Sequence, residues 1–203
     1  MIAHDPALRP VRLPPADFRD VRVPITRQKR RLWYRVHQST YPARFFSLNA
    51  SHRFSHPECP FEFLYLGGDP ATCLFERFGD IAYDRKLAIA NSIWRAYSIS
   101  SLEVPQITVC DLTNAKTLSA LRVDLAALTN NDLKIAQAWG LAIQQHPANF
   151  EGIKFKSRFN NKVCLAVFRK QSLEERVEEK LLDSLPEADS AVNWLHHHKV
   201  SLY

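Results

Sequence analysis

The residues whose types and spacing suggest chemistry are an acidic side chain, Glu76, two upstream arginines, Arg35 and Arg53, and a downstream serine, Ser157. A carboxylate stabilises positive charge that develops during a reaction. The planar guanidinium group binds phosphate oxygens through paired hydrogen bonds, and a hydroxyl adds a further one. These residue types suit an anionic substrate, provided that the fold brings them together.

The segment around Glu76 predicts a strand, a turn and a helix. Aromatic residues alternate with other residues over 61–66 at the period of a strand, and Gly67-Gly68 ends it. Asp69 can cap the following helix, and Pro70 suits its first turn. Glu76 then lies on the second turn, away from an apolar face made of Ala71, Leu74, Phe75 and Phe78. Taken alone, Glu76 also fits an ordinary solvated helix residue.

Several short motifs, in order, show a family resemblance. They are Trp33-Tyr34-Arg35-Val36, Ser51-His52-Arg53-Phe54, Leu64-Tyr65-Leu66, Glu76, Val109-Cys-Asp-Leu112 and Gly152-Ile-Lys-Phe-Lys-Ser157-Arg-Phe-Asn-Asn-Lys-Val163. In this order and spacing, over about residues 32 to 170, the chain resembles the RES domain family, named for its arginine, glutamate and serine.

The resemblance implies a fold and an activity. The fold would be α+β, a single RES domain with an ADP-ribosyltransferase-like mixed sheet core flanked by helices. Family members of this kind are toxins of bacterial toxin–antitoxin pairs that consume NAD, by hydrolysis, by phosphorolysis or by transfer of its ADP-ribose. NAD would therefore be the substrate, with no metal, in a cleft that an antitoxin covers when the gene has such a partner.

The resemblance also assigns the site residues. Glu76 and Arg53 would be catalytic, and Arg35, Arg53, Tyr65 and Ser157 would bind NAD. Arg53 matches an arginine that follows glycines in family members, whereas this chain has Ala50-Ser51-His52 at that point. Side chains there occupy space that glycine leaves open.

The chemistry gives each of these residues a role. Cleavage of the nicotinamide–ribose bond passes through a ribosyl cation similar to the oxocarbenium ion of sugar hydrolysis. Glu76 would hold the ribose hydroxyls and face that charge, so that its interaction strengthens toward the transition state. Arg53 and Arg35 would bind the pyrophosphate, Tyr65 would stack on the nicotinamide or ribose, and Ser157 would bond a phosphate or ribose oxygen.

Each of these residues also has a structural interpretation. The arginines can be surface residues, Tyr65 can belong to a core strand, and Ser157 can bond local backbone. At the level of function three hypotheses stay open: an NAD glycohydrolase or phosphorylase, an ADP-ribosyltransferase that modifies a protein or nucleic acid, and a non-catalytic RES-like binding module. The last is favoured if His52 and Phe54 fill the cleft.

Composition places the chain among compact globular proteins. It has 203 residues, of which 46% are hydrophobic and 24% charged. It lacks an apolar run long enough for a membrane span and an apolar signal-peptide core, so we expect a cytoplasmic protein. Four scattered cysteines suit reduced thiols, and the spacing indicates no metal site.

The net charge of +6 is concentrated at the N-terminus. Residues 1–31 hold eight basic residues against three acidic ones and five of the twelve prolines, which predicts a basic, extended arm ahead of a RES domain with C-terminal helices at 32–203. A basic arm can seek an acidic partner. The chain shows no aromatic and basic sheet motif of the kind that stacks nucleic-acid bases.

The remaining segments predict strands and helices in alternation. Residues 107–110 and 163–168 indicate strands, the second apolar on both faces and therefore central in a sheet. A helix is expected at 131–145 with Trp139 in the core, and another from Ser172 with Leu173, Val177 and Leu181 facing inward. His196-His197-His198 suits a polar helix end. Without a Gly-x-Gly-x-x-Gly turn, this pattern favours an α+β domain over a doubly wound sheet.

Overall fold

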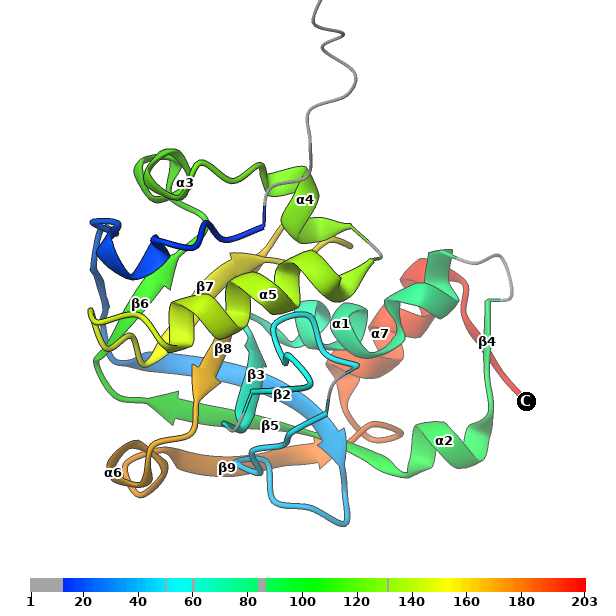
Figure 1. The fold of residues 1–203 in the computed structure, drawn as a ribbon. Helices are drawn as coiled ribbons and strands as arrows, with labels where there is room; N and C mark the ends of the chain where they lie inside the picture. The colour runs from blue at the N-terminus through cyan, green and yellow to red at the C-terminus, as the bar shows by residue number, and fades with distance from the viewer. Residues whose placement is uncertain (1–12, 50, 60, 84–86, 131) are drawn as a thin grey trace, which may run out of the picture.

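The fold is built on a curled, mixed β-sheet with helices packed around it (Figure 1). It comes from a computed structural model, which describes residues 13–49, 51–59, 61–83, 87–130 and 132–203. Within that part of the chain, the strand order of the main sheet is β1-β6-β7-β8-β3-β2-β5-β9, and β10 and β4 form a separate parallel pair. Only β6 and β7 are parallel in the main sheet. The predicted α+β class with a mixed sheet is confirmed.

The strands of the main sheet are β1 (Thr26–Gln28), β2 (Arg31–Gln38), β3 (Phe63–Gly67), β5 (Tyr97–Val104), β6 (Ile107–Asp111), β7 (Gly152–Lys156), β8 (Val163–Phe168) and β9 (Glu178–Ser184). The paired short strands are β4 (Ala88–Ile89) and β10 (Ser201–Leu202). The helices are η1 (Phe18–Asp20), α1 (Pro70–Tyr83), α2 (Asn91–Arg95), α3 (Ala115–Leu121), α4 (Leu125–Thr129), α5 (Leu133–Gln144), α6 (Gln171–Glu174) and α7 (Asp189–His198).

The centre of the sheet is buried on both faces, as the sequence predicts for 163–168. Along β8, Cys164, Ala166 and Phe168 pack in one apolar cluster, while Leu165 and Val167 pack in another. The first cluster lies under α5, whose Trp139 is buried as expected. Since successive strand residues face opposite sides, a strand without polar positions must be covered on both.

The sheet curls because its chain connections require it. The residues that end β5 and begin β6, Val104 and Ile107, are separated by two residues but belong to strands far apart in the sheet order. Both pack in the same apolar cluster with Trp33 of β2. A flat sheet could not bring these strands together, so the right-handed twist is carried far enough to half-close the sheet.

The C-terminal third contains one wrong prediction. The helix expected from Ser172 is only the short α6, and Ser172 does not cap it. The chain then extends into β9, an edge strand that pairs with β5, so Leu181 is 62% exposed instead of buried. Leu173 and Val177 are buried in the core as predicted, whereas Leu181 lies on β9 instead of on a helix.

A second prediction fails on α1. Ala71 is exposed, although the sequence placed it on the apolar face of this helix.

The N-terminal segment lies against the domain. Residues 1–12 lie outside the described residues; after them, Phe18 and Val23 are buried in the cluster under α5, and β1 pairs with β6 at the sheet edge. The division of the chain at residue 31 stays a prediction. Among the described residues, none of the helices is both long and apolar enough to cross a bilayer.

Candidate active site around Glu76

Glu76 is placed by the strand, turn and helix that the sequence predicts. β3 ends at Gly67, and the Asp69 carboxylate accepts hydrogen bonds from the Thr72 backbone N–H at 2.8 Å and the Thr72 hydroxyl at 2.9 Å. This cap fixes the start of α1. A Cβ on Gly67 would lie 2.6 Å from the Cys73 sulfur, so glycine is what lets α1 start so close to the strand.

One stripe of α1 faces the turn between β7 and β8. Thr72, Glu76 and Asp80 recur every four residues and so lie on one side of the helix. Asn160 donates to the Thr72 hydroxyl at 3.1 Å, Ser157 donates to Glu76 Oε1 at 2.6 Å, and the Arg158 guanidinium pairs with Asp80 at 2.5 Å. Three bonds at successive helical turns therefore lock the Ser157 turn onto α1.

Apolar residues also pack the turn closely against α1. On Gly79 a Cβ would come within 2.7 Å of the Phe159 ring, which itself lies parallel to Phe75 with centroids 6.5 Å apart. Within the turn, Asn161 has a left-handed φ of 58°, a conformation that asparagine adopts more readily than most residues. The turn is thus held by its own backbone and by α1.

Glu76 lines a cavity of about 150 Å³. The lining side chains come from β2, β3, α1, β7, β8 and the loop before β3; they are Arg35, Val36, His52, Arg53, Tyr65, Leu66, Cys73, Glu76, Arg77, Phe155 and Cys164, with Gly67. The structure therefore brings four of the five predicted site residues around one space. The fifth, Ser157, is 3% exposed and reaches the cavity through its bond to Glu76.

The Glu76 carboxylate is both accessible and partly dehydrated. The residue keeps solvent-accessible surface because the cavity is open, yet protein atoms surround much of its side chain. This partial burial raises the pKa of Glu76 above its ordinary value of 4.5, while the Ser157 hydrogen bond and the charges of Arg53 and Arg158 oppose the rise. The carboxylate is oriented by one hydrogen bond and is close enough to Arg53 and Arg158 for their charges to act on it.

Arg53 lines the same cavity as Glu76 and is fixed by a hydrogen bond. Its Nη1 donates to the Leu128 carbonyl oxygen of α4 at 2.5 Å. Burial lowers the pKa of Arg53, while the charge of Glu76 raises it, and the group stays protonated at neutral pH. Arg53 therefore presents a preorganised cation to the cavity.

Tyr65 supports the loop that carries Arg53. Its hydroxyl oxygen accepts a hydrogen bond from the Phe54 backbone N–H at 3.1 Å and lies 3.1 Å from the Ser55 hydroxyl. Its ring lies 4.9 Å from that of His52. Burial raises the pKa of Tyr65, so the hydroxyl stays protonated. The ring lines the cavity while its polar end anchors the loop.

Arg35 is engaged with backbone. Its Nη1 donates to the carbonyl oxygens of Ala43 at 2.5 Å and Phe45 at 2.6 Å, and burial lowers the pKa of Arg35 to about 10. Arg35 is therefore charged at neutral pH and holds the loop after β2 while its side chain lines the cavity.

The sequence did not single out several of the lining residues. His52 is noted there only as a replacement for glycine, and Arg77 and Cys73 are not assigned to a site. Cys73 and Arg77 lie on α1 close to Glu76, so the helical repeat was the signal that could have found them. The non-catalytic module would have both His52 and Phe54 in the cleft: His52 does line the cavity, whereas Phe54 is 1% exposed and packs edge-on against Phe155.

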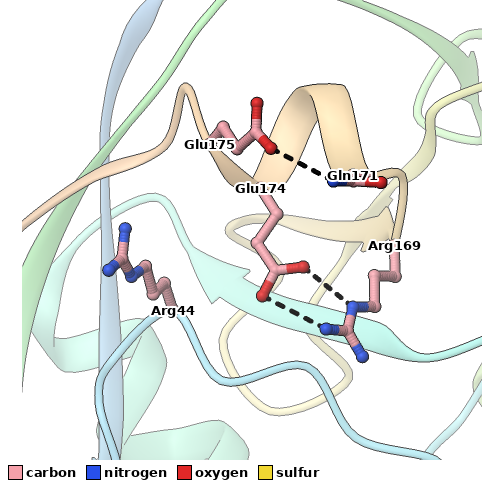
Figure 2. Close-up of a pocket in the computed structure, with 5 residues that line it drawn as sticks. All are labelled: Arg44, Arg169, Gln171, Glu174 and Glu175. Carbon is pink, nitrogen blue, oxygen red and sulfur yellow. Dashed lines mark hydrogen bonds and ion pairs between the residues drawn. The ribbon is translucent and has the colours of Figure 1, made fainter.

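A larger surface hollow, of about 660 Å³, lies elsewhere (Figure 2). It is lined by Arg44, Arg169, Gln171, Glu174 and Glu175, and shares no residue with the cavity at Glu76. Arg169 pairs with Glu174 at 2.8 Å and also with Glu62. These ion pairs are solvent-exposed, and exposed ion pairs contribute little energy, so the hollow lacks the fixed, partly buried charges expected of a catalytic site.

Comparison with known proteins bears on this site. The sequence model of a family described as the RES domain matches residues 32–189. One chain of the crystal structure of the M. tuberculosis MbcT–MbcA toxin–antitoxin complex is similar in fold, with a TM-score of 0.60 and 19% identity over 83% of this chain and 92% of that chain. No curated protein matches the sequence at a significant level.

Proposed function

The chain belongs to the RES domain family, and from that premise we propose that it consumes NAD by cleaving the bond between nicotinamide and ribose. The observation that carries the proposal is the Glu76 carboxylate, held by Ser157 at 2.6 Å and lining one cavity with Arg53 and Tyr65. A carboxylate and a cation that line one cavity match a substrate with a cationic reacting centre and an anionic pyrophosphate.

The reaction balances without an added cofactor. The bond from the ribose anomeric carbon to the nicotinamide nitrogen breaks, and its electron pair leaves with nicotinamide, which departs neutral. Glu76 stabilises the positive charge that develops on the ribose as the bond breaks, and since the ribose of the bound substrate does not carry that charge, the interaction lowers the barrier. Water, phosphate or a target nucleophile then bonds to the anomeric carbon, and any proton that this nucleophile loses passes to solvent.

The other residues have supporting roles in the proposal. Arg53 binds pyrophosphate oxygens, and Tyr65 presents its ring to the nicotinamide or ribose. Ser157, for which the sequence suggested a bond to the substrate, acts by orienting Glu76. Arg35 adds positive charge to the cavity and holds the loop after β2.

We also propose that the protein is the toxin of a toxin–antitoxin pair, with an antitoxin that covers the cavity. The similar fold of a chain in a toxin–antitoxin complex supports this. ADP-ribosyl transfer to a macromolecule uses the same cation, and the opening of the cavity to solvent, which leaves Glu76 accessible, gives it specific support.

The test is incubation of the purified protein with NAD, with and without phosphate. The wild type should release nicotinamide together with ADP-ribose, or ADP-ribose 1-phosphate when phosphate is the acceptor. Glu76→Gln keeps the shape and removes the charge, and should lose this activity; Glu175→Gln, the same change outside the cavity, should keep it. Labelled NAD that marks protein or nucleic acid would identify the transferase instead. Equal nicotinamide release by wild type and Glu76→Gln would refute the role of Glu76.

A further inference from the structure

An open groove of about 620 Å³ begins beside the Glu76–Ser157 bond and is distinct from the hollow of Figure 2. It is lined by Asp80, Leu125, Thr129, Lys156, Ser157, Arg158, Phe159 and Asn161. It shares no lining residue with the cavity, but Ser157 lines the groove and bonds the carboxylate that lines the cavity. The two hollows therefore meet at the residue proposed to face the ribose.

The cavity alone is too small for a dinucleotide. A space of about 150 Å³ holds a single aromatic ring such as benzene, whereas sites for ligands of drug size occupy roughly 300–1,000 Å³. If the nicotinamide enters the cavity beside Tyr65 and its ribose reaches Glu76, the rest of the molecule must lie outside. The groove has the necessary size and begins at that point.

The groove also has the charge for an anion. Lys156, the last residue of β7, and Arg158 flank Ser157, and within the described residues Lys156 forms no ion pair. Arg158 lies close enough to the site for its charge to affect Glu76 and Arg53 alike. The charge of Arg158 therefore reaches both the groove and the cavity, while Asp80 adds a negative charge to the groove wall.

Arg158 is held in place by a partner that is easily exchanged. Its side chain is 22% exposed, lies over the Phe159 ring at 4.5 Å from the centroid, and pairs with Asp80, whose side chain is 79% exposed. An ion pair to so exposed a carboxylate contributes little to stability. A phosphate can offer the same guanidinium two oxygens at once, which is the stronger interaction.

We propose that this groove binds the nucleoside diphosphate half of the substrate, with Arg158 and Lys156 on the phosphates and Leu125 and Phe159 forming an apolar wall for the base. This rests on the proposed function for the choice of dinucleotide. Arg158 exchanges Asp80 for a phosphate when substrate binds. The turn that carries it does not need to move, because its backbone is fixed by bonds from Ser157 N–H to the Lys162 carbonyl at 2.8 Å and from Asn161 N–H to the Ser157 carbonyl at 3.0 Å.

The test measures binding of ADP and of nicotinamide separately to the whole chain by titration calorimetry. Arg158→Gln should weaken ADP binding about tenfold or more, and Lys156→Gln should weaken it less; neither should change the affinity for nicotinamide. Asp80→Asn removes a carboxylate that competes with phosphate for Arg158, so it should keep or tighten ADP binding. Arg169→Gln, which removes the same charge from the hollow of Figure 2, is the matched control.

The outcomes separate this proposal from the proposed function. If wild type releases nicotinamide but ADP affinity is the same in Arg158→Gln, Lys156→Gln and wild type, the groove assignment is wrong and the enzyme assignment stands. ADP binding that depends on Arg158 in a protein with no turnover contradicts only the enzyme assignment. Thermal unfolding of each variant shows whether it folds. If Arg158→Gln does not fold, the ADP affinity of Lys156→Gln, a change on the open groove wall, tests the groove assignment instead.

Discussion

The cavity and the groove are joined by one hydrogen bond, from Ser157 to Glu76, but their charged side chains are held by different kinds of partner. In the cavity, Arg53 and Glu76 have shifted pKa values, and each is fixed by a hydrogen bond. In the groove, Arg158 pairs with an exposed carboxylate on an open wall. Charges held in place beside the reacting centre stabilise a transition state without reorganising, while a cation whose carboxylate partner is exposed can exchange that partner for an anion. Changes in the cavity should therefore alter turnover, and changes in the groove should alter binding.

The largest effect is expected for Glu76→Gln. Loss of the charge that faces the ribosyl cation should reduce kcat by about 10²–10³-fold while leaving the affinity for ADP nearly unchanged. Nicotinamide release under saturating NAD, together with ADP titration of the same variant, measures both quantities. A variant that bound ADP poorly but turned over normally would reverse the contrast between the two hollows.

The same substitution should also affect stability in a predictable direction. Because the pKa of Glu76 is raised in the folded protein, ionisation of this group opposes folding, and stability falls as the pH rises from the ordinary value of 4.5 through the folded-state pKa. Glu76→Gln removes this dependence, so its melting temperature should equal or exceed that of wild type at pH 7. Thermal unfolding of both proteins at pH 4 and pH 7 measures it.

Arg53→Lys should have the next largest effect. The charge remains, but the planar fork is lost, and with it the geometry of the bond to the Leu128 carbonyl. We expect kcat/KM to fall by about 10–100-fold, measured by nicotinamide release at low NAD. Arg169→Lys on the outer surface is the control and should behave as wild type.

Ser157→Ala should change the pH dependence of the reaction. The Ser157 hydrogen bond lowers the pKa of Glu76, so its removal raises that pKa further, and the ionised form is reached only at higher pH. The acid limb of the kcat profile should move upward, with roughly tenfold less activity on that limb. A uniform loss at every pH, with the limb unmoved, would show that Ser157 acts on the substrate directly.

The smallest effect is expected for Tyr65→Phe. The aromatic ring stays in the cavity, but the Phe54 N–H loses its acceptor, which should cost about 1 kcal/mol of stability. In a chain of this size that corresponds to a fall of about 2–4 °C in melting temperature. The loop that carries Arg53 loosens with it, so kcat/KM should fall by a few-fold at most.

The local features of the site followed from sequence because each depends on neighbouring residues. Gly67, Asp69 and Pro70 mark where β3 ends and α1 begins, and the helical repeat then places Glu76 on the second turn. The apolar run at 163–168 similarly required a covered strand. The error at 178–184 has a physical cause: the spacing of Leu173, Val177 and Leu181 suits a helix, but the free edge of β5 supplied hydrogen-bond partners for a strand.

The sequence by itself determined the elements and the identity of the groups that carry charge, since period, capping and turn residues act over a few positions. Only the tertiary structure decided their partners. Ser157 lies 81 residues from Glu76 in the sequence, and Arg158 lies 78 residues from Asp80. Arg53 donates to a backbone carbonyl 75 residues away, on α4. Such pairs form because the curled sheet and α1 bring distant segments together, and burial then requires each polar group to find a partner.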